Sequence, residues 1–93
     1  MTIKVEFKSG LKDITGTNHV TIDSSATGTF ETVLKEVIRL YPRLEEEMFY
    51  SDGTLDHIYQ IIHNSRRLSW PEDKAVRVRD GDTLVFFVFM AGG

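Results

Sequence analysis

Two short segments near the N-terminus alternate between apolar and polar residues. Residues 3–7 read Ile-Lys-Val-Glu-Phe, and residues 20–22 read Val-Thr-Ile. This period of two is typical of a strand with one buried and one solvated face. Glycine and polar residues between Ser9 and Asn18 predict a loop. The first part of the chain therefore predicts two strands that could pair as a hairpin with a long connection.

A single helical stripe of apolar residues follows. Its members are spaced by three or four residues, which places them on one face of a helix. They are Phe30, Val33, Leu34, Val37, Ile38 and Tyr41. Thr29 is a suitable N-cap, and Glu31 is well placed in the first turn. Pro42 disfavours helical geometry at the preceding residue and predicts the end of this helix, while residues 44–49 predict a further short helical turn.

The second half of the chain predicts three strands separated by turns. Residues 58–62 are rich in β-forming types, Asn64-Ser65 predicts a tight turn, and residues 67–70 predict the returning strand. After the turn at residues 80–82, residues 83–89 predict the last strand. This strand is apolar at every position from 84 to 89, as expected for the middle of a sheet.

One helical stripe and one sheet face can bury each other. The patterns therefore predict an α+β fold, in which a mixed sheet of four or five strands carries one main helix packed on one face. The 93 residues are enough for one core, and no repeat, linker or low-complexity segment divides them. We expect a single domain over residues 1–93, with residues 90–93 as a flexible C-terminal tail.

Composition and charge exclude several classes of function. The chain has no cysteine, which rules out disulfides, thiolate metal sites and a cysteine nucleophile, and which fits a reducing compartment. Its net charge of −3 argues against a non-specific nucleic-acid binder. No apolar run approaches the roughly 20 residues of a membrane span, and the N-terminal residues do not resemble a signal peptide. We expect a cytoplasmic protein with neither a nucleic acid nor a membrane as partner.

No motif for catalysis is recognisable. The three histidines, His19, His57 and His63, have no usual metal spacing, and we expect no metal site. Glycine-rich phosphate loops, nucleophile elbows and His-Glu-x-x-His patterns are absent from the sequence. The run at residues 45–47 is all glutamate, which predicts a solvated face or, alternatively, a contact for a partner's basic patch. The sequence therefore does not predict an enzyme.

The C-terminal residues suggest a different kind of chemistry. The sequence ends in Ala91-Gly92-Gly93. Such an end can be a frayed terminus without function. It can also be a working part, because a tail almost without side chains can thread a narrow channel and present its free α-carboxylate as the reactive group.

The last strand suggests a surface for a partner. Leu84 and Phe86 are expected to point toward the helix, whereas Val85, Phe87 and Phe89 would point to the opposite face. An exposed apolar patch with two phenylalanines usually marks a binding surface. The alternative is that a side chain from elsewhere covers this face, and the candidates are Leu44, Met48 and Trp70.

With these features, the chain resembles the ubiquitin-like sulfur carriers, which have a β-grasp fold. The resemblance covers the whole chain, and its most specific parts are Asp80-Gly81-Asp82 before the last strand and Gly92-Gly93 after it. It implies that a ubiquitin-activating-type enzyme uses ATP to adenylate the carboxylate of Gly93. A sulfur donor then displaces AMP and leaves a thiocarboxylate, which supplies a biosynthetic enzyme.

The resemblance also assigns roles to residues. Gly92 and Gly93 would be the functional residues, and Met90 and Ala91 would lie in the threaded segment. The outward positions of the last strand, Val85, Phe87 and Phe89, would be docking contacts. The carrier itself would bind no cofactor, since ATP is used by the activating partner. The resemblance admits molybdopterin, thiamine, cysteine and tRNA-thiolation pathways.

Two other functions remain open. The first is a protein modifier that forms isopeptide bonds to lysines through Gly93. The second is a β-grasp interaction domain whose terminal glycines have no chemical role.

Overall fold

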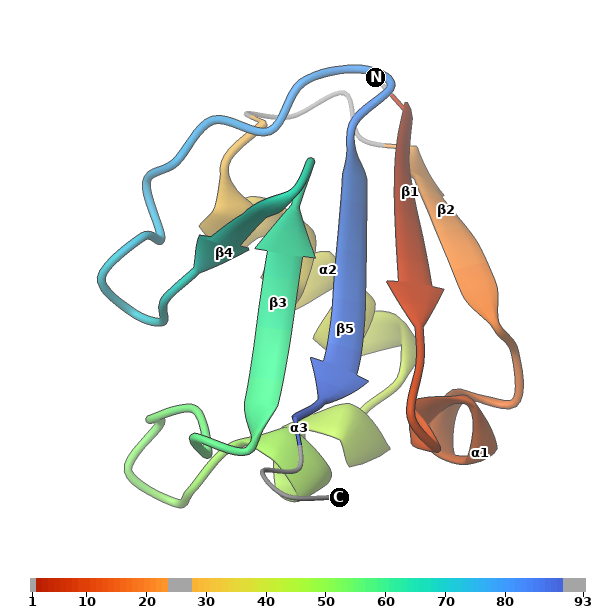
Figure 1. The fold of residues 1–93 in the computed structure, drawn as a ribbon, viewed down its shortest axis with the longest axis vertical. Helices are drawn as coiled ribbons and strands as arrows, with labels where there is room; N and C mark the ends of the chain where they lie inside the picture. Colours follow the sequence, from red (N-terminus) through yellow and green to blue (C-terminus); the bar gives the residue numbers. More distant parts are fainter. Residues whose placement is uncertain (1, 24–27, 90–93) are drawn as a thin grey trace.

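The computed structural model describes residues 2–23 and 28–89 of the chain (Figure 1). Five strands form one sheet in the order β2-β1-β5-β3-β4. Their bounds are Thr2–Phe7 for β1, His19–Asp23 for β2, Tyr59–His63 for β3, Arg66–Leu68 for β4 and Thr83–Val88 for β5. The last strand, β5, is the central one, as its uninterrupted apolar sequence predicts.

The pairing of β5 makes the sheet mixed. It runs parallel to β1, with Val5 opposite Leu84, and antiparallel to β3, with Ile61 opposite Phe86. The outer pairs, β1 with β2 and β3 with β4, are antiparallel. A mixed five-stranded sheet is therefore confirmed.

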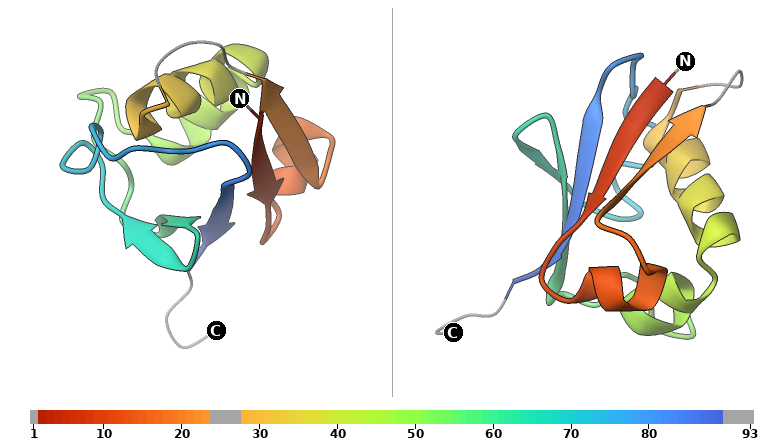
Figure 2. Two further views of the ribbon diagram at one scale, coloured as in Figure 1. Left: turned by 90° about the horizontal axis from the view of Figure 1, so that it is seen from above. Right: turned by 90° about the vertical axis from the view of Figure 1, so that its right-hand side faces the viewer.

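The main helix, α2 (Phe30–Leu40), packs on one face of this sheet, together with α3 (Arg43–Met48) (Figure 2). Thr29 caps α2 as predicted. Its Oγ1 accepts a hydrogen bond from the backbone N–H of Thr32 at 3.2 Å, and the hydroxyl of Thr32 accepts one from the backbone N–H of Thr29 at 3.1 Å. This reciprocal capping box fixes where the helix begins. The helix ends before Pro42, also as predicted.

A third helix, α1 (Leu11–Thr15), occupies part of the predicted loop between β1 and β2. It lies between Gly10 and Gly16, whose φ angles of 85° and 80° are in the left-handed region that favours glycine. Only Leu11 of this helix is buried. Five residues with one buried position give no periodic signal, so the sequence pattern could not reveal this helix.

The strand β4 is shorter than predicted. It ends at Leu68, because the backbone N–H of Ser69 donates to Oδ2 of Asp73 at 2.7 Å and so turns away from the sheet. Trp70 consequently lies outside the strand. Its ring packs edge-on against Phe30, with ring centroids 5.6 Å apart.

The core lies between the sheet and the helices. The side chains of the core residues are exposed by a few per cent or less. These residues come from all five strands, all three helices and the connection before β5. The fully enclosed ones include Ile3, Val5, Phe30, Val37, Leu44, Met48, Ile61, Leu84 and Phe86. The fold is thus two-layered, and the helices cover only one face of the sheet.

A polar cluster ties the β3–β4 turn to the start of β5. The carboxylate of Asp82 accepts hydrogen bonds from His63 Nε2 at 2.7 Å, from Asn64 Nδ2 at 2.8 Å and from the backbone N–H of Arg79 at 2.7 Å. Burial of the carboxylate would raise its pKa, but these donors outweigh burial and lower the pKa of Asp82 to about 2. The ionised carboxylate therefore stabilises the folded state.

We expect Asp82→Asn to destabilise the protein by about 1–2 kcal/mol at pH 5. Because the folded pKa lies below the ordinary value of 3.8, the contribution is present above pH 4 and disappears as the pH falls toward 2. Urea unfolding at pH 5 and pH 2.5 measures it, and the difference between wild type and variant should shrink at the lower pH. Glu72→Gln, at an exposed carboxylate in the same connection, is the control. An equal loss at both pH values would contradict the assignment.

Candidate partner-binding surface

The alternation of side chains along β5 divides them between the two faces of the sheet. Leu84 and Phe86 are fully buried against the helical layer. Val85 and Phe87 are half-buried on the other face, and Phe89, directly after the strand, is 52% exposed. This confirms the predicted orientation of all five side chains.

Neighbouring residues of β3 extend this apolar surface. Ile62 lies directly opposite Val85. Ile58, 37% exposed, accepts a hydrogen bond from the backbone N–H of Phe89 through its carbonyl at 2.6 Å. Together they form a continuous surface, called here the apolar strip, which consists of Ile58, Ile62, Val85, Phe87 and Phe89. The sequence analysis missed the two isoleucines, because they join the strip only through the register of β3 on β5.

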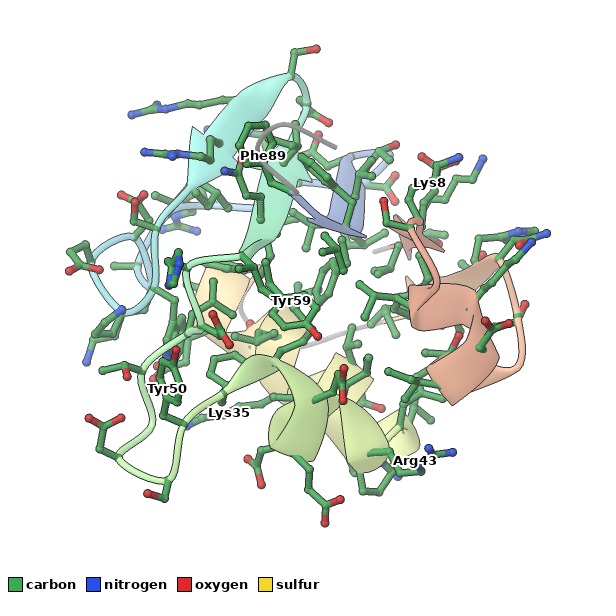
Figure 3. All side chains as sticks on the ribbon, turned by 60° about the horizontal axis from the view of Figure 1, so that its bottom comes forward. Lys8, Lys35, Arg43, Tyr50, Tyr59 and Phe89 are labelled. Carbon is green, nitrogen blue, oxygen red and sulfur yellow. The ribbon has the colours of Figure 1, made fainter. Side chains whose placement is uncertain are left out.

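Charged and polar side chains border the apolar strip. On β1, Lys4 and Glu6 form an exposed ion pair with an N–O distance of 3.7 Å. Gln60 is not part of this border, since it lies within the strip, between the two isoleucines of β3 and opposite Phe87. Figure 3 shows Phe89 and Lys8 on the side of the sheet away from α3. An apolar centre with a polar border is the usual composition of a protein-binding surface.

The alternative that another side chain covers this face is wrong. Leu44 and Met48 are buried on the helix side of the sheet, as parts of α3. Trp70 also lies on that side, where its ring contacts Phe30 and Phe49 at centroid distances of 5.6 and 6.4 Å. Since all three pack with the helices, none of them covers the apolar strip.

The apolar strip ends where the C-terminal segment begins. Phe89 is the last described residue. Its backbone N–H donates to the carbonyl of Ile58, which pairs the chain with the residue before β3 at this point. Met90, Ala91, Gly92 and Gly93 lie outside the described residues, so their roles stay predictions. The docking roles of Val85, Phe87 and Phe89 likewise stay predictions, on side chains that point outward.

On the helix side of the sheet, the buried Tyr59 of β3 has a hydrogen-bond partner on α3. The hydroxyl of Tyr59 donates to Oε1 of Glu47 at 2.8 Å, which joins β3 to α3. Burial, then this hydrogen bond and the nearby carboxylate, raise the pKa of Tyr59 to about 12. Among the described residues, no three His, Cys, Asp or Glu side chains gather in a way that could hold a metal ion. Across residues 2–23 and 28–89, no helix is both long and apolar enough to cross a membrane.

No protein-family model and no curated protein matches the chain. Solved structures do match. SAMP1 from Haloferax volcanii is 22% identical with a TM-score of 0.84, and the match covers 100% of both chains. The putative molybdopterin converting factor subunit 1 from Pyrococcus furiosus is 19% identical with a TM-score of 0.72, covering 97% of this chain and 99% of that one.

A third match comes from the BexX/CysO complex of Amycolatopsis orientalis. It is 18% identical with a TM-score of 0.73 and covers 98% of this chain and 99% of that one. These three structures share the fold of this chain, and it is the fold that the resemblance implies. The chain has the ubiquitin-like β-grasp fold.

Proposed function

We propose that this chain is a sulfur carrier whose reactive group is the C-terminal carboxylate of Gly93. One observation carries the proposal. The central strand holds an outward-facing apolar strip that ends at Phe89, directly before the terminal segment with Gly92-Gly93. A partner that binds the apolar strip would therefore receive the tail in the same event. The shared fold with a molybdopterin converting factor subunit and with CysO, which occurs in a complex with BexX, supports this function.

The chemistry would need no catalytic side chain on the carrier. A carboxylate is a poor acyl donor, so a ubiquitin-activating-type enzyme first joins Gly93 to AMP from ATP and releases pyrophosphate. Sulfide then attacks the acyl carbon, AMP leaves, and Gly93 carries a thiocarboxylate. A sulfur-accepting biosynthetic enzyme takes up Met90 to Gly93 and passes the sulfur to its own substrate, and water supplies the oxygen that restores the carboxylate. The carrier is thus a substrate rather than an enzyme, and we place it in the cytoplasm with its ATP-using partner.

Intact mass spectrometry tests this proposal. After incubation with an activating enzyme from the same genome, ATP and sulfide, the chain should gain about 16 mass units, because one oxygen is replaced by sulfur. A variant without Gly92-Gly93 should gain nothing, although its thermal unfolding should match that of the full chain. Absence of any adduct on the full chain would contradict the proposal.

A second candidate is a protein modifier that joins Gly93 to target lysines. The likeness to SAMP1, a small archaeal modifier protein, favours it. The same activated tail serves both functions, and the nucleophile decides between them. Conjugates of higher mass, absent from the variant without Gly92-Gly93, would identify the modifier. Cellular function that survives this deletion would identify the third alternative, an interaction domain.

A further inference from the structure

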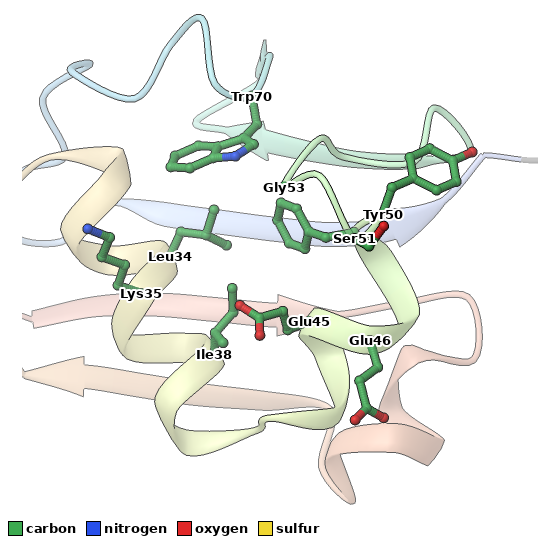
Figure 4. A pocket seen from close by; sticks show the side chains of 10 residues that line it. Leu34, Lys35, Ile38, Glu45, Glu46, Tyr50, Ser51, Gly53 and Trp70 are labelled. Atoms are coloured by element: carbon green, nitrogen blue, oxygen red, sulfur yellow. The ribbon is translucent and has the colours of Figure 1, made fainter.

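A hollow of about 470 Å³ lies on the helix side of the molecule, away from the apolar strip. It opens between α2, α3, the loop after α3 and Trp70 (Figure 4). Its location on the other face of the sheet means that a partner on the apolar strip would leave it accessible. The function proposed above does not involve it.

The walls of this hollow are mainly apolar. Leu34 and Ile38 of α2 lie on one side of it and the Trp70 ring on another (Figure 4), and Phe49 lines it as well. Phe49 and Trp70 stand edge to face, with an interplanar angle of 86°. Trp70 is half-buried, and it lines the hollow. Such walls suit an alkyl chain and offer a π-face to a cation.

The charges around the hollow are unbalanced. Glu45 and Glu46 of α3 line it, and no ion pair engages either carboxylate within the described part of the chain. In Figure 4, Glu45 points toward Ile38 across the hollow. The one lysine there, Lys35, already pairs with Glu31 of its own helix, with an N–O distance of 3.7 Å. The hollow therefore presents uncompensated negative charge beside apolar walls.

We propose that this hollow binds an arginine side chain of a partner protein, together with a neighbouring aliphatic residue. The methylene stem of arginine would lie on Leu34 and Ile38. Its guanidinium would reach the carboxylate of Glu45 while it stacks on Trp70, a combination that the planar, weakly hydrated guanidinium satisfies better than an ammonium. The volume exceeds that of one side chain, which leaves room for the aliphatic neighbour. This site is independent of the proposed chemistry at Gly93.

The chain provides its own reporter, because Trp70 is its only tryptophan. The probe is acetyl-leucyl-arginine amide, titrated up to about 20 mM while Trp70 fluorescence and the amide NMR spectrum are recorded. The comparison peptide carries citrulline, which has the shape of arginine without the charge. We expect a saturable change with arginine, and binding at least about fivefold weaker with citrulline. The shifted amides should include those of Phe49 and Gly53.

Two variants, each of which removes one negative charge, test where the arginine peptide binds. Glu45→Gln should weaken binding of the arginine peptide about fivefold or more, since it removes the carboxylate that faces the hollow. Glu36→Gln, at a half-buried residue of α2 that pairs with Arg39 and does not line the hollow, should leave binding unchanged. Both variants should still form the Gly93 thiocarboxylate.

Several results would overturn the proposal. They are the absence of saturable change, equal binding of the arginine and citrulline peptides, and amide shifts confined to the apolar strip. Trp70 fluorescence that varies with the concentration of the protein alone would also overturn it, because a second copy would then be the occupant. Failure of the thiocarboxylate assay would not affect these results, so the two proposals fail separately.

Discussion

Phe87→Asp is expected to weaken binding to the activating enzyme by about 30-fold or more while the domain stays folded. The side chain lies at the centre of the apolar strip, between Val85 and Phe89 along β5 and opposite Gln60 on β3. A partner that covers the strip would have to bury the new carboxylate without a counter-charge, which is costly. The free protein keeps the carboxylate in water, because this face of the sheet is open.

Binding measured by calorimetry, together with thermal unfolding, checks this result. Thr21→Asp is the matched control, since it adds the same charge to the same face of the sheet on β2, two strands from β5. It should change binding little. Unfolding of Phe87→Asp would show that this side chain supports the core, and unchanged binding would show that the partner docks elsewhere.

The elements that the sequence predicts best are those whose pattern is complete within one segment. Six apolar residues in a helical stripe located α2, and Thr29 marked its beginning. The uninterrupted apolar residues of β5 indicated its central place. Their alternation placed Phe86 and Phe87 on opposite faces, because side chains along a strand repeat with a period of two, and the burial of Phe86 confirms the expectation that it faces the helix.

The features that the sequence did not predict depend on contacts between distant segments. The short helix α1 is held by a single buried residue, Leu11, so no periodic pattern marks it. The isoleucines of the apolar strip join it only through the register of β3 on β5. The hollow is lined by residues of α2 and α3 and by Trp70. Trp70 lies outside the sheet because β4 ends at Leu68, two residues before the predicted end of that strand. The pattern of apolar residues within one strand or helix carries no information about contacts with distant segments.

The two candidate sites also differ in what the sequence could say about their chemistry. The role proposed for Gly93 rests on a resemblance to a family, carried by the residues around the last strand and the terminal glycines. For the acidic run of α3, the sequence left two interpretations open, a solvated face or a contact for a basic patch of a partner. The apolar walls beside Glu45 now favour the second interpretation for that residue, whereas Glu47 is engaged by the Tyr59 hydroxyl.

Phe86→Ala should cost about 3–5 kcal/mol in the free energy of unfolding. The ring is fully buried and meets Phe7 edge to face, with centroids 5.8 Å apart, while Phe7 meets Tyr41 in the same way at 5.5 Å. Truncation therefore opens a cavity in the centre of the core and removes one member of an aromatic chain. Domains of this size have total stabilities of about 5–15 kcal/mol, so Phe86→Leu, with a smaller expected loss, serves if the alanine variant does not fold.

Urea unfolding of Phe86→Ala and Phe89→Ala compares the stability that the two faces of the sheet contribute near the end of β5. Phe89 is 52% exposed, so its truncation should cost about 1 kcal/mol or less. Phe89→Ala should nevertheless weaken partner binding, which Phe86→Leu should not do once folded. Equal losses of stability would mean that Phe89 is part of the core. The apolar strip would then serve the stability of the fold. The proposal that a partner binds the strip and receives the tail in the same event would be contradicted.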